Sequence, residues 1–169
     1  MTHYMELLAT MQPWNLILFM AIPVVLAETV AITELAILFS RDTTSWVKKL
    51  NATASVVAGV YFAGVFAYLF STAVVPITQA GAWRGPADVI AVGSYLLGVV
   101  PLVGMALVDL GILGRARDTM GKLGMHATFV ALFLVVAHIA MIFGMLNPEV
   151  LGYASAPATP ATQHAQMVM

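Results

Sequence analysis

Four long apolar segments, separated by short polar ones, dominate the pattern of the chain. They occupy roughly residues 16–39, 52–75, 89–113 and 123–146. Each has the roughly 20 apolar residues that an α-helix needs to cross a bilayer. Proline stands close to one end of each segment, and the tryptophans fall at proposed helix ends, where indole rings favour the headgroup region. The pattern predicts an all-α membrane protein with four transmembrane helices.

Two parts of this pattern resemble each other. Residues 34–43 match residues 109–119, with one inserted residue in the second copy. Residues 49–53 match residues 122–128, after a shorter loop and with two inserted residues. The match aligns Glu34 with Asp109, and Asn51 with His126. Such a repeat is typical of tandem helical hairpins related by a pseudo-two-fold axis along the membrane normal. We expect an antiparallel four-helix bundle over residues 16–147, with repeats at about 16–75 and 89–147.

Composition supports the membrane assignment and excludes several classes of function. The chain is 61% hydrophobic and 9% charged, with a mean hydropathy of +0.94, far from the usual soluble domain. A formal charge of −1 argues against a nucleic-acid partner, and the absence of cysteine excludes disulfides and thiolate metal sites. Small residues should permit close approach of the helices: Ala58, Gly59, Ala63, Gly64, Gly93, Gly98 and Gly104.

Basic residues predict the orientation in the membrane. Six of the seven lie in the first and third loops: Arg41, Lys48, Lys49, Arg115, Arg117 and Lys122. The positive-inside rule puts these loops in the cytoplasm of a bacterial inner membrane, with both termini outside. Residues 1–15 then form an extracytoplasmic segment, and residues 148–169 a disordered extracytoplasmic tail. A cleaved signal peptide is the alternative at the N-terminus, but no basic residue precedes the first apolar run.

Ionisable side chains inside the apolar segments are the candidate functional residues: Glu28, Glu34, Asp109, His126 and His138. A carboxylate at the bilayer centre costs about 2.5–3.5 kcal/mol, so each needs a partner or a purpose. Counting a rise of 1.5 Å per residue puts Glu34, Asp109 and His126 about 5–9 Å from the cytoplasmic helix ends. The same count puts Glu28 about 18 Å deep and His138 about 22 Å deep, which makes them natural partners.

The inner level, formed by Glu34, Asp109 and His126, has several interpretations. Carboxylates with an imidazole suit a divalent metal ion. The same groups, extended through Glu28 and His138, suit a pathway for protons or ions. The structural alternative is that arginines of the cytoplasmic loops reach back and neutralise the two acids near the interface.

A second candidate site lies on the fourth segment, where His138, Met141 and Met145 share one helical face. Met20 of the first segment belongs to the same half of the bundle. Imidazole and thioether ligands suit haem b or a soft metal ion, although methionines at this spacing usually serve packing. His3, His164, Met167 and Met169 lie in the termini, where we expect mobile chain.

The first segment reads Gln12-Pro-Trp-Asn-Leu-Ile-Leu-Phe-Met-Ala-Ile-Pro-Val-Val-Leu-Ala-Glu28-Thr-Val-Ala-Ile-Thr-Glu34-Leu. It resembles a small uncharacterised bacterial family of four-helix membrane proteins, sometimes labelled permeases. The resemblance implies transport and adds nothing about individual residues. Two hypotheses stay open: a carrier or channel subunit for protons or a divalent cation, and a redox, assembly or purely structural subunit with haem or quinone near His138. Because 169 residues leave little room for alternating access, we expect a homo-oligomer or a larger membrane complex.

Overall fold

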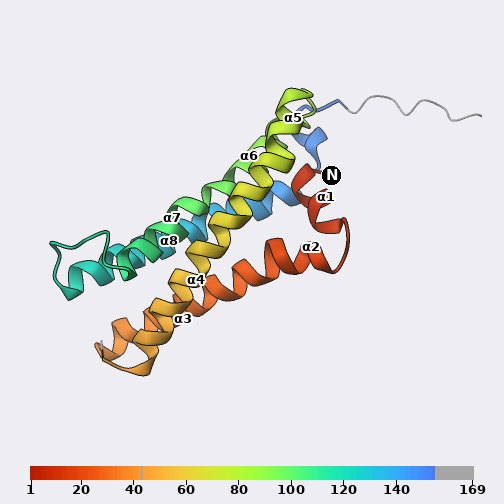
Figure 1. Cartoon of the computed structure of the whole chain (residues 1–169). Helices are drawn as coiled ribbons and strands as arrows, with labels where there is room; N and C mark the ends of the chain where they lie inside the picture. Colours follow the sequence, from red (N-terminus) through yellow and green to blue (C-terminus); the bar gives the residue numbers. More distant parts are fainter. Residues whose placement is uncertain (43, 155–169) are drawn as a thin grey trace, which may run out of the picture.

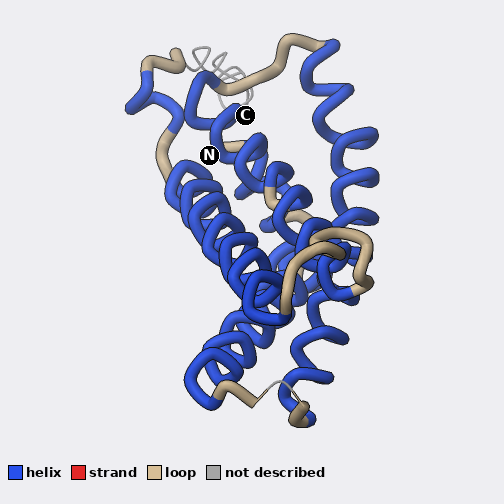
Figure 2. Tube along the Cα trace, turned by 90° about the vertical axis from the view of Figure 1, so that its left-hand side faces the viewer, coloured by secondary structure: helices blue, strands red, loops and turns tan. Residues whose placement is uncertain are grey.

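The computed structural model describes residues 1–42 and 44–154, and in this part of the chain every regular element is helical. In order, the elements are α1 (His3–Ala9), α2 (Trp14–Leu16), η1 (Ile17–Ala21), α3 (Ile22–Ser40), α4 (Trp46–Leu69), η2 (Phe70–Val74), α5 (Val75–Gln79), α6 (Gly85–Leu97), α7 (Val99–Asp109), α8 (Thr119–Met145) and η3 (Pro148–Leu151). The elements η1 and η2 are π-helical turns, and η3 is a 3-10 helix. Figure 2 shows how little of the described chain lies outside helices.

Consecutive elements join into four rods: Trp14–Ser40, Trp46–Gln79, Gly85–Asp109 and Thr119–Met145. Each is long and apolar enough to cross a membrane. The prediction that the protein is all-helical is confirmed for the described residues, and the four apolar rods suggest an integral membrane protein in a lipid bilayer. The second rod begins earlier than the apolar pattern indicated, because the polar turn that holds Lys48 and Lys49 is already helical.

Proline explains the interruptions of the rods. Proline has no N–H for the carbonyl four residues before it, so the preceding turn loosens. Accordingly, η1 precedes Pro23, η2 precedes Pro76, and the break at Gly98 between α6 and α7 precedes Pro101. The Tyr95 hydroxyl donates a 2.6 Å hydrogen bond to the carbonyl of Phe19, the one that Pro23 leaves without its usual donor. The missing proline N–H thus accounts for the interruption of three of the four rods.

The rods pack unequally. Helix α4 lies between α3 and α7, while α8 packs along α6 and α7 and meets α3 over a much shorter stretch. Figure 1 shows α2 and α3 leaning away from α6, α7 and α8, with the α3–α4 and α7–α8 connections at the end opposite α1 and α5. We call the end with these two connections the basic end, because Arg41, Lys48, Lys49, Arg115, Arg117 and Lys122 belong to it. The opposite end, with α1 and α5, is the N-terminal end.

Close helix contacts depend on a few glycines. A Cβ atom at Gly59 would lie 2.6 Å from Cβ of Ala106 and 2.8 Å from the carbonyl oxygen of Leu102, so α4 and α7 can touch only because this atom is missing. Gly98 and Gly104 are likewise crowded by the rings of Phe133 and Phe129. By contrast, Gly64 and Gly93 have open space where a Cβ would stand, and the expectation that they serve packing was wrong.

Two apolar clusters fill the space between the rods. The central cluster includes Val30, Ala58, Phe62, Leu102 and Phe133, and the second, near the N-terminal end, includes Tyr4, Leu8, Phe19, Leu69 and Leu96. Lipid tails are as apolar as these side chains, so packing contacts rather than release from water stabilise such clusters in a bilayer. The central cluster separates the polar residues of the two ends.

The N-terminal segment is an ordered part of the fold. Helix α1 begins at the N-cap Thr2, whose side-chain oxygen accepts from Met5 and donates to the carbonyl of Gly144 in α8. Gly144 has no side chain where the ring of Tyr4 lies. The expectation that His3 lies in mobile chain was therefore wrong. At the other terminus, η3 lies inside the segment for which we expected disorder, whereas His164, Met167 and Met169 fall outside the described residues.

Candidate functional site

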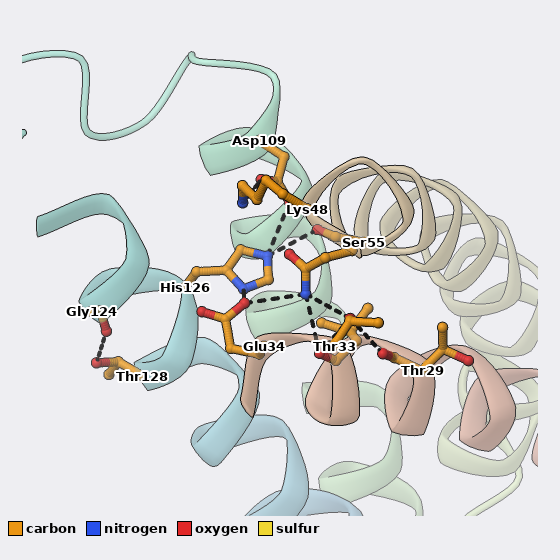
Figure 3. Close-up of polar contacts among 11 residues, drawn as sticks. Thr29, Thr33, Glu34, Lys48, Ser55, Asp109, Gly124, His126 and Thr128 are labelled. Carbon is orange, nitrogen blue, oxygen red and sulfur yellow. Dashed lines mark hydrogen bonds and ion pairs between the residues drawn. The ribbon is translucent and has the colours of Figure 1, made fainter. Parts of the chain in front are cut away.

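His126 of α8 lies between two carboxylates (Figure 3). Its Nδ1 atom is 2.9 Å from Oε2 of Glu34 on α3, and its Nε2 atom is 3.0 Å from Oδ2 of Asp109 at the end of α7. The Ser55 hydroxyl of α4 is 3.3 Å from the same Nε2. His126 is 1% exposed and Glu34 is 3% exposed. All four rods thus contribute a side chain to one buried polar cluster, which we call the imidazole cluster.

Asn51 holds the α3 side of the cluster. Its amide nitrogen donates to the carbonyl of Val30, to the hydroxyl of Thr33 and to Oε2 of Glu34, at 3.1, 2.9 and 3.2 Å. Thr33 in turn donates to the carbonyl of Thr29. Ser55 follows Asn51 by four residues, so both point from α4 to the same place.

The cluster keeps spare hydrogen-bonding capacity. Among residues 1–42 and 44–154, three buried side-chain atoms make no hydrogen bond: Oε1 of Glu34, Oδ1 of Asn51 and Nδ1 of His126. The last of these is within ion-pair distance of Glu34 but is not aligned for a hydrogen bond. All three belong to this one site. Buried polar atoms without a hydrogen-bond partner are rare in folded proteins. They indicate strain, a site for water or an ion, or a functional role.

An opening leads from the basic end to the cluster. A cavity of about 300 Å³ is lined by Lys48, Lys122, Asp109 and His126, with Val108, Gly111, Thr119 and Leu123. Lys48 lies 3.4 Å from Oδ1 of Asp109, and its side chain is 31% exposed. Lys48, rather than the loop arginines that the structural alternative invoked, is the cation beside Asp109, and Arg115 instead donates to the carbonyl of Gly111. One carboxylate therefore borders an opening, while the other lies deeper.

The three inner groups meet as predicted, but not as ligands of one metal ion. The imidazole ring separates the carboxylates, because each contacts a different ring nitrogen. A shared metal would need the three donor atoms to converge on one point. Accordingly, no set of three or more histidine or acidic side chains suited to a metal occurs in the described part of the chain.

Glu28 and His138 do not pair. The contact of Glu34 with His126 sets the levels of α3 and α8. Glu28 lies six residues beyond Glu34, or about 9 Å, and His138 lies twelve residues beyond His126, or about 18 Å. Both side chains are exposed on the surface of the rods, and Nδ1 of His138 is 2.6 Å from the carbonyl of Leu134 in its own helix. The expectation of similar depth was wrong, since it counted from helix ends instead of from a contact.

The proposed haem or soft-metal face is also on the surface. Met20, Met141 and Met145 are 37%, 47% and 72% exposed, and His138 is exposed beside them on α8. None of the four lines the cavity beside Asp109. Their arrangement is that of side chains facing lipid.

A second polar cluster, which sequence reasoning missed, lies at the N-terminal end. Asp88 of α6 is completely buried and accepts hydrogen bonds from the backbone N–H of His3 at 2.7 Å and of Arg84 at 3.2 Å. Nδ1 of His3 is 2.5 Å from Oδ2 of Asp88, the same oxygen that accepts from Arg84. Arg84 also pairs with Glu6 at 2.6 Å and donates to the carbonyl of Met1. The sequence signal was an acid in the first turn after Pro86, which the apolar pattern assigned to a loop.

Tyr4, next to this cluster, is buried, and its hydroxyl has no hydrogen-bond partner in the described residues. Burial raises the pKa of Tyr4 to about 12, because the phenolate would lose its hydration.

One protein-family model matches residues 1–160. The chain belongs to DUF6803, a family of unknown function. This membership agrees with the resemblance to an uncharacterised family, but supports neither a bacterial source nor the permease label. Comparisons with curated proteins and with solved structures give no match. The buried polar clusters of this DUF6803 member are the features of its structure that bear on function.

Proposed function

We propose that the chain is a small proton-coupled carrier or channel subunit, and that the imidazole cluster is its proton-binding site. The observation that carries this proposal is the position of His126, with each ring nitrogen next to a different buried carboxylate. Imidazole can accept a proton at one nitrogen and release another from the second. A proton arriving at Asp109 can thereby pass to Glu34.

The surroundings of the cluster support exchange with water at one end only. The cavity beside Asp109 opens toward the basic end, whereas Val30, Phe62, Leu102 and Phe133 of the central cluster stand on the other side. A proton held by Glu34 would have no polar continuation through these side chains. Release toward the N-terminal end would need a rearrangement of the rods, which fits a carrier better than an open channel. The basic end would face the cytoplasm of an inner membrane.

Glu28 supports the idea that the subunit works in an oligomer. Its carboxyl group is exposed within the rod Trp14–Ser40 and has no partner in the described residues. Facing lipid in the ionised form would cost about 2.5–3.5 kcal/mol at the bilayer centre. A neighbouring copy or another membrane protein covering α3 would remove this cost.

Infrared spectroscopy of the purified protein tests the proton site. When pH is lowered, the C=O band of a protonated carboxyl group should appear in the wild type and shift in D2O, because the cluster exchanges with water. Glu34→Gln and Asp109→Asn should each change this band, and His126→Gln should change its titration. Glu28→Gln serves as the matched control, because it removes a carboxyl group outside the cluster.

The same variants separate function from structure. If the band in Glu34→Gln/Asp109→Asn equals that of the wild type, the cluster is a fixed ion-pair network and the proposal fails. In liposomes with an internal pH dye and an imposed potassium diffusion potential, we expect proton entry in the wild type. This entry should be lost in the triple variant Glu34→Gln/Asp109→Asn/His126→Gln, which removes the buried charges together, and kept in His138→Gln.

A further inference from the structure

A cavity of about 260 Å³ lies at the N-terminal end, between α1 and the second and third rods. Leu69, Thr72, Ala73, Val74, Pro76 and Ile77 line it from the second rod, and Val92, Tyr95 and Leu96 from the third. Its remaining lining residues, His3, Tyr4 and Leu7, come from α1. Two walls are thus parts of candidate membrane-spanning helices.

Two of the lining residues, His3 and Tyr4, each have one polar side-chain atom without a hydrogen-bond partner in the described residues. Nδ1 of His3 is held by the buried carboxylate of Asp88, and Nε2 has no hydrogen-bond partner in the described residues. The same is true of the Tyr4 hydroxyl, although the residue is only 8% exposed. A carboxylate on one ring nitrogen fixes the tautomer and makes the other nitrogen a better acceptor. The central cluster separates this cavity from the imidazole cluster.

The size and chemistry of the cavity select a class of ligand. A dry cavity of about 150 Å³ already accepts benzene, so 260 Å³ accommodates one substituted six-membered ring. Apolar walls with a few convergent polar groups are typical of small-molecule sites. We propose that this cavity binds the headgroup of a lipid-soluble quinone or quinol. A quinol hydroxyl would donate to Nε2 of His3, and the Tyr4 hydroxyl would donate to a ring oxygen.

This proposal is independent of the proton-binding site and differs from the earlier hypothesis of a quinone near His138. It concerns binding alone, with no electron transfer.

Tryptophan fluorescence gives the test, because quinones quench indole emission. Trp83 donates to Thr78, the neighbour of the lining residue Ile77. In a Trp14→Phe/Trp46→Phe background this one indole reports on the cavity. A benzoquinone with a decyl tail should quench it saturably. His3→Leu should weaken binding tenfold or more, and Tyr4→Phe by about two- to tenfold, the range of one hydrogen bond.

Two further variants keep the result interpretable if His3→Leu loosens α1. Ala73→Leu fills the cavity without touching either polar group and should abolish saturable quenching. His138→Leu removes an exposed histidine elsewhere and should bind as the wild type does. The proposal is overturned if the parent protein shows no saturable quenching, or if Tyr4→Phe and His3→Leu both bind unchanged. Displacement by decanol as effective as by the quinone would overturn it too, since it would show a site for acyl chains.

Discussion

Replacing His126 by glutamine should be among the most damaging single changes in this protein. The side chain is 1% exposed, and its removal leaves the side chains of Glu34 and Asp109, 4% and 7% exposed, without their shared partner. Two unit charges 3 Å apart attract by roughly 5 kcal/mol at an effective dielectric constant of about 20, before desolvation is subtracted. Breaking a buried ion pair by removing one partner costs about 3–5 kcal/mol in measured cases. We expect a loss of this size in the free energy of unfolding.

Reversible unfolding in mixed micelles, followed by circular dichroism as the fraction of sodium dodecyl sulfate rises, measures this loss. His138→Gln is the matched control, because this exposed histidine should change stability by less than about 0.5 kcal/mol. The triple variant Glu34→Gln/Asp109→Asn/His126→Gln removes both carboxylates with the imidazole, and should recover much of the loss. The charge argument is refuted if His126→Gln loses less than about 1 kcal/mol, or if the triple variant is no more stable than the single one.

Three further predictions use the same measurement or simple spectroscopy. Gly59→Leu should destabilise the protein by about 1–3 kcal/mol, because the new Cβ would meet Ala106 and the backbone of Leu102. Gly64→Ala should not be destabilising, because open space surrounds this position, and equal effects of the two variants would contradict the close approach of α4 to α7. Tyr95→Phe should lower the free energy of unfolding by about 0.5–1.5 kcal/mol, because it removes the hydrogen bond to the carbonyl of Phe19. Tyr68→Phe, at an exposed residue, is the control, and a loss no larger than the control's would show that this hydrogen bond adds nothing to stability. The raised pKa of Tyr4 predicts that the free energy of unfolding falls as pH rises from about 10, the ordinary pKa, through about 12, because in this range Tyr4 ionises readily only in the unfolded chain. Ultraviolet absorbance should show a phenolate near pH 12 that Tyr4→Phe removes, and persistence of this signal in the variant would assign it to another tyrosine.

Part of the candidate site could be predicted because the depth of each residue depends on its distance from the end of its own helix. Glu34, Asp109 and His126 were placed at one level by counting residues from the helix ends, and the structure brings them together. Counting failed for Glu28 and His138, because a small error in each helix end and the tilt of α3 add up over a longer stretch. Lys48 and Ser55 were missed, because nothing in their own segment singles out the face of α4 that they share with Asn51.

The sequence by itself determined the number of the apolar rods, the prolines that interrupt the first and third of them, and the presence of acids where lipid cannot solvate them. These follow from local chemistry: the length of an apolar run, a missing N–H and the cost of a charge in hydrocarbon. Only the tertiary structure decided that His126 lies between two carboxylates, that Glu28 stays on the surface and that α1 folds back to place His3 against Asp88. The physical reason is that each contact joins residues 17 to 92 positions apart, whose meeting depends on helix tilt and register rather than on any local pattern.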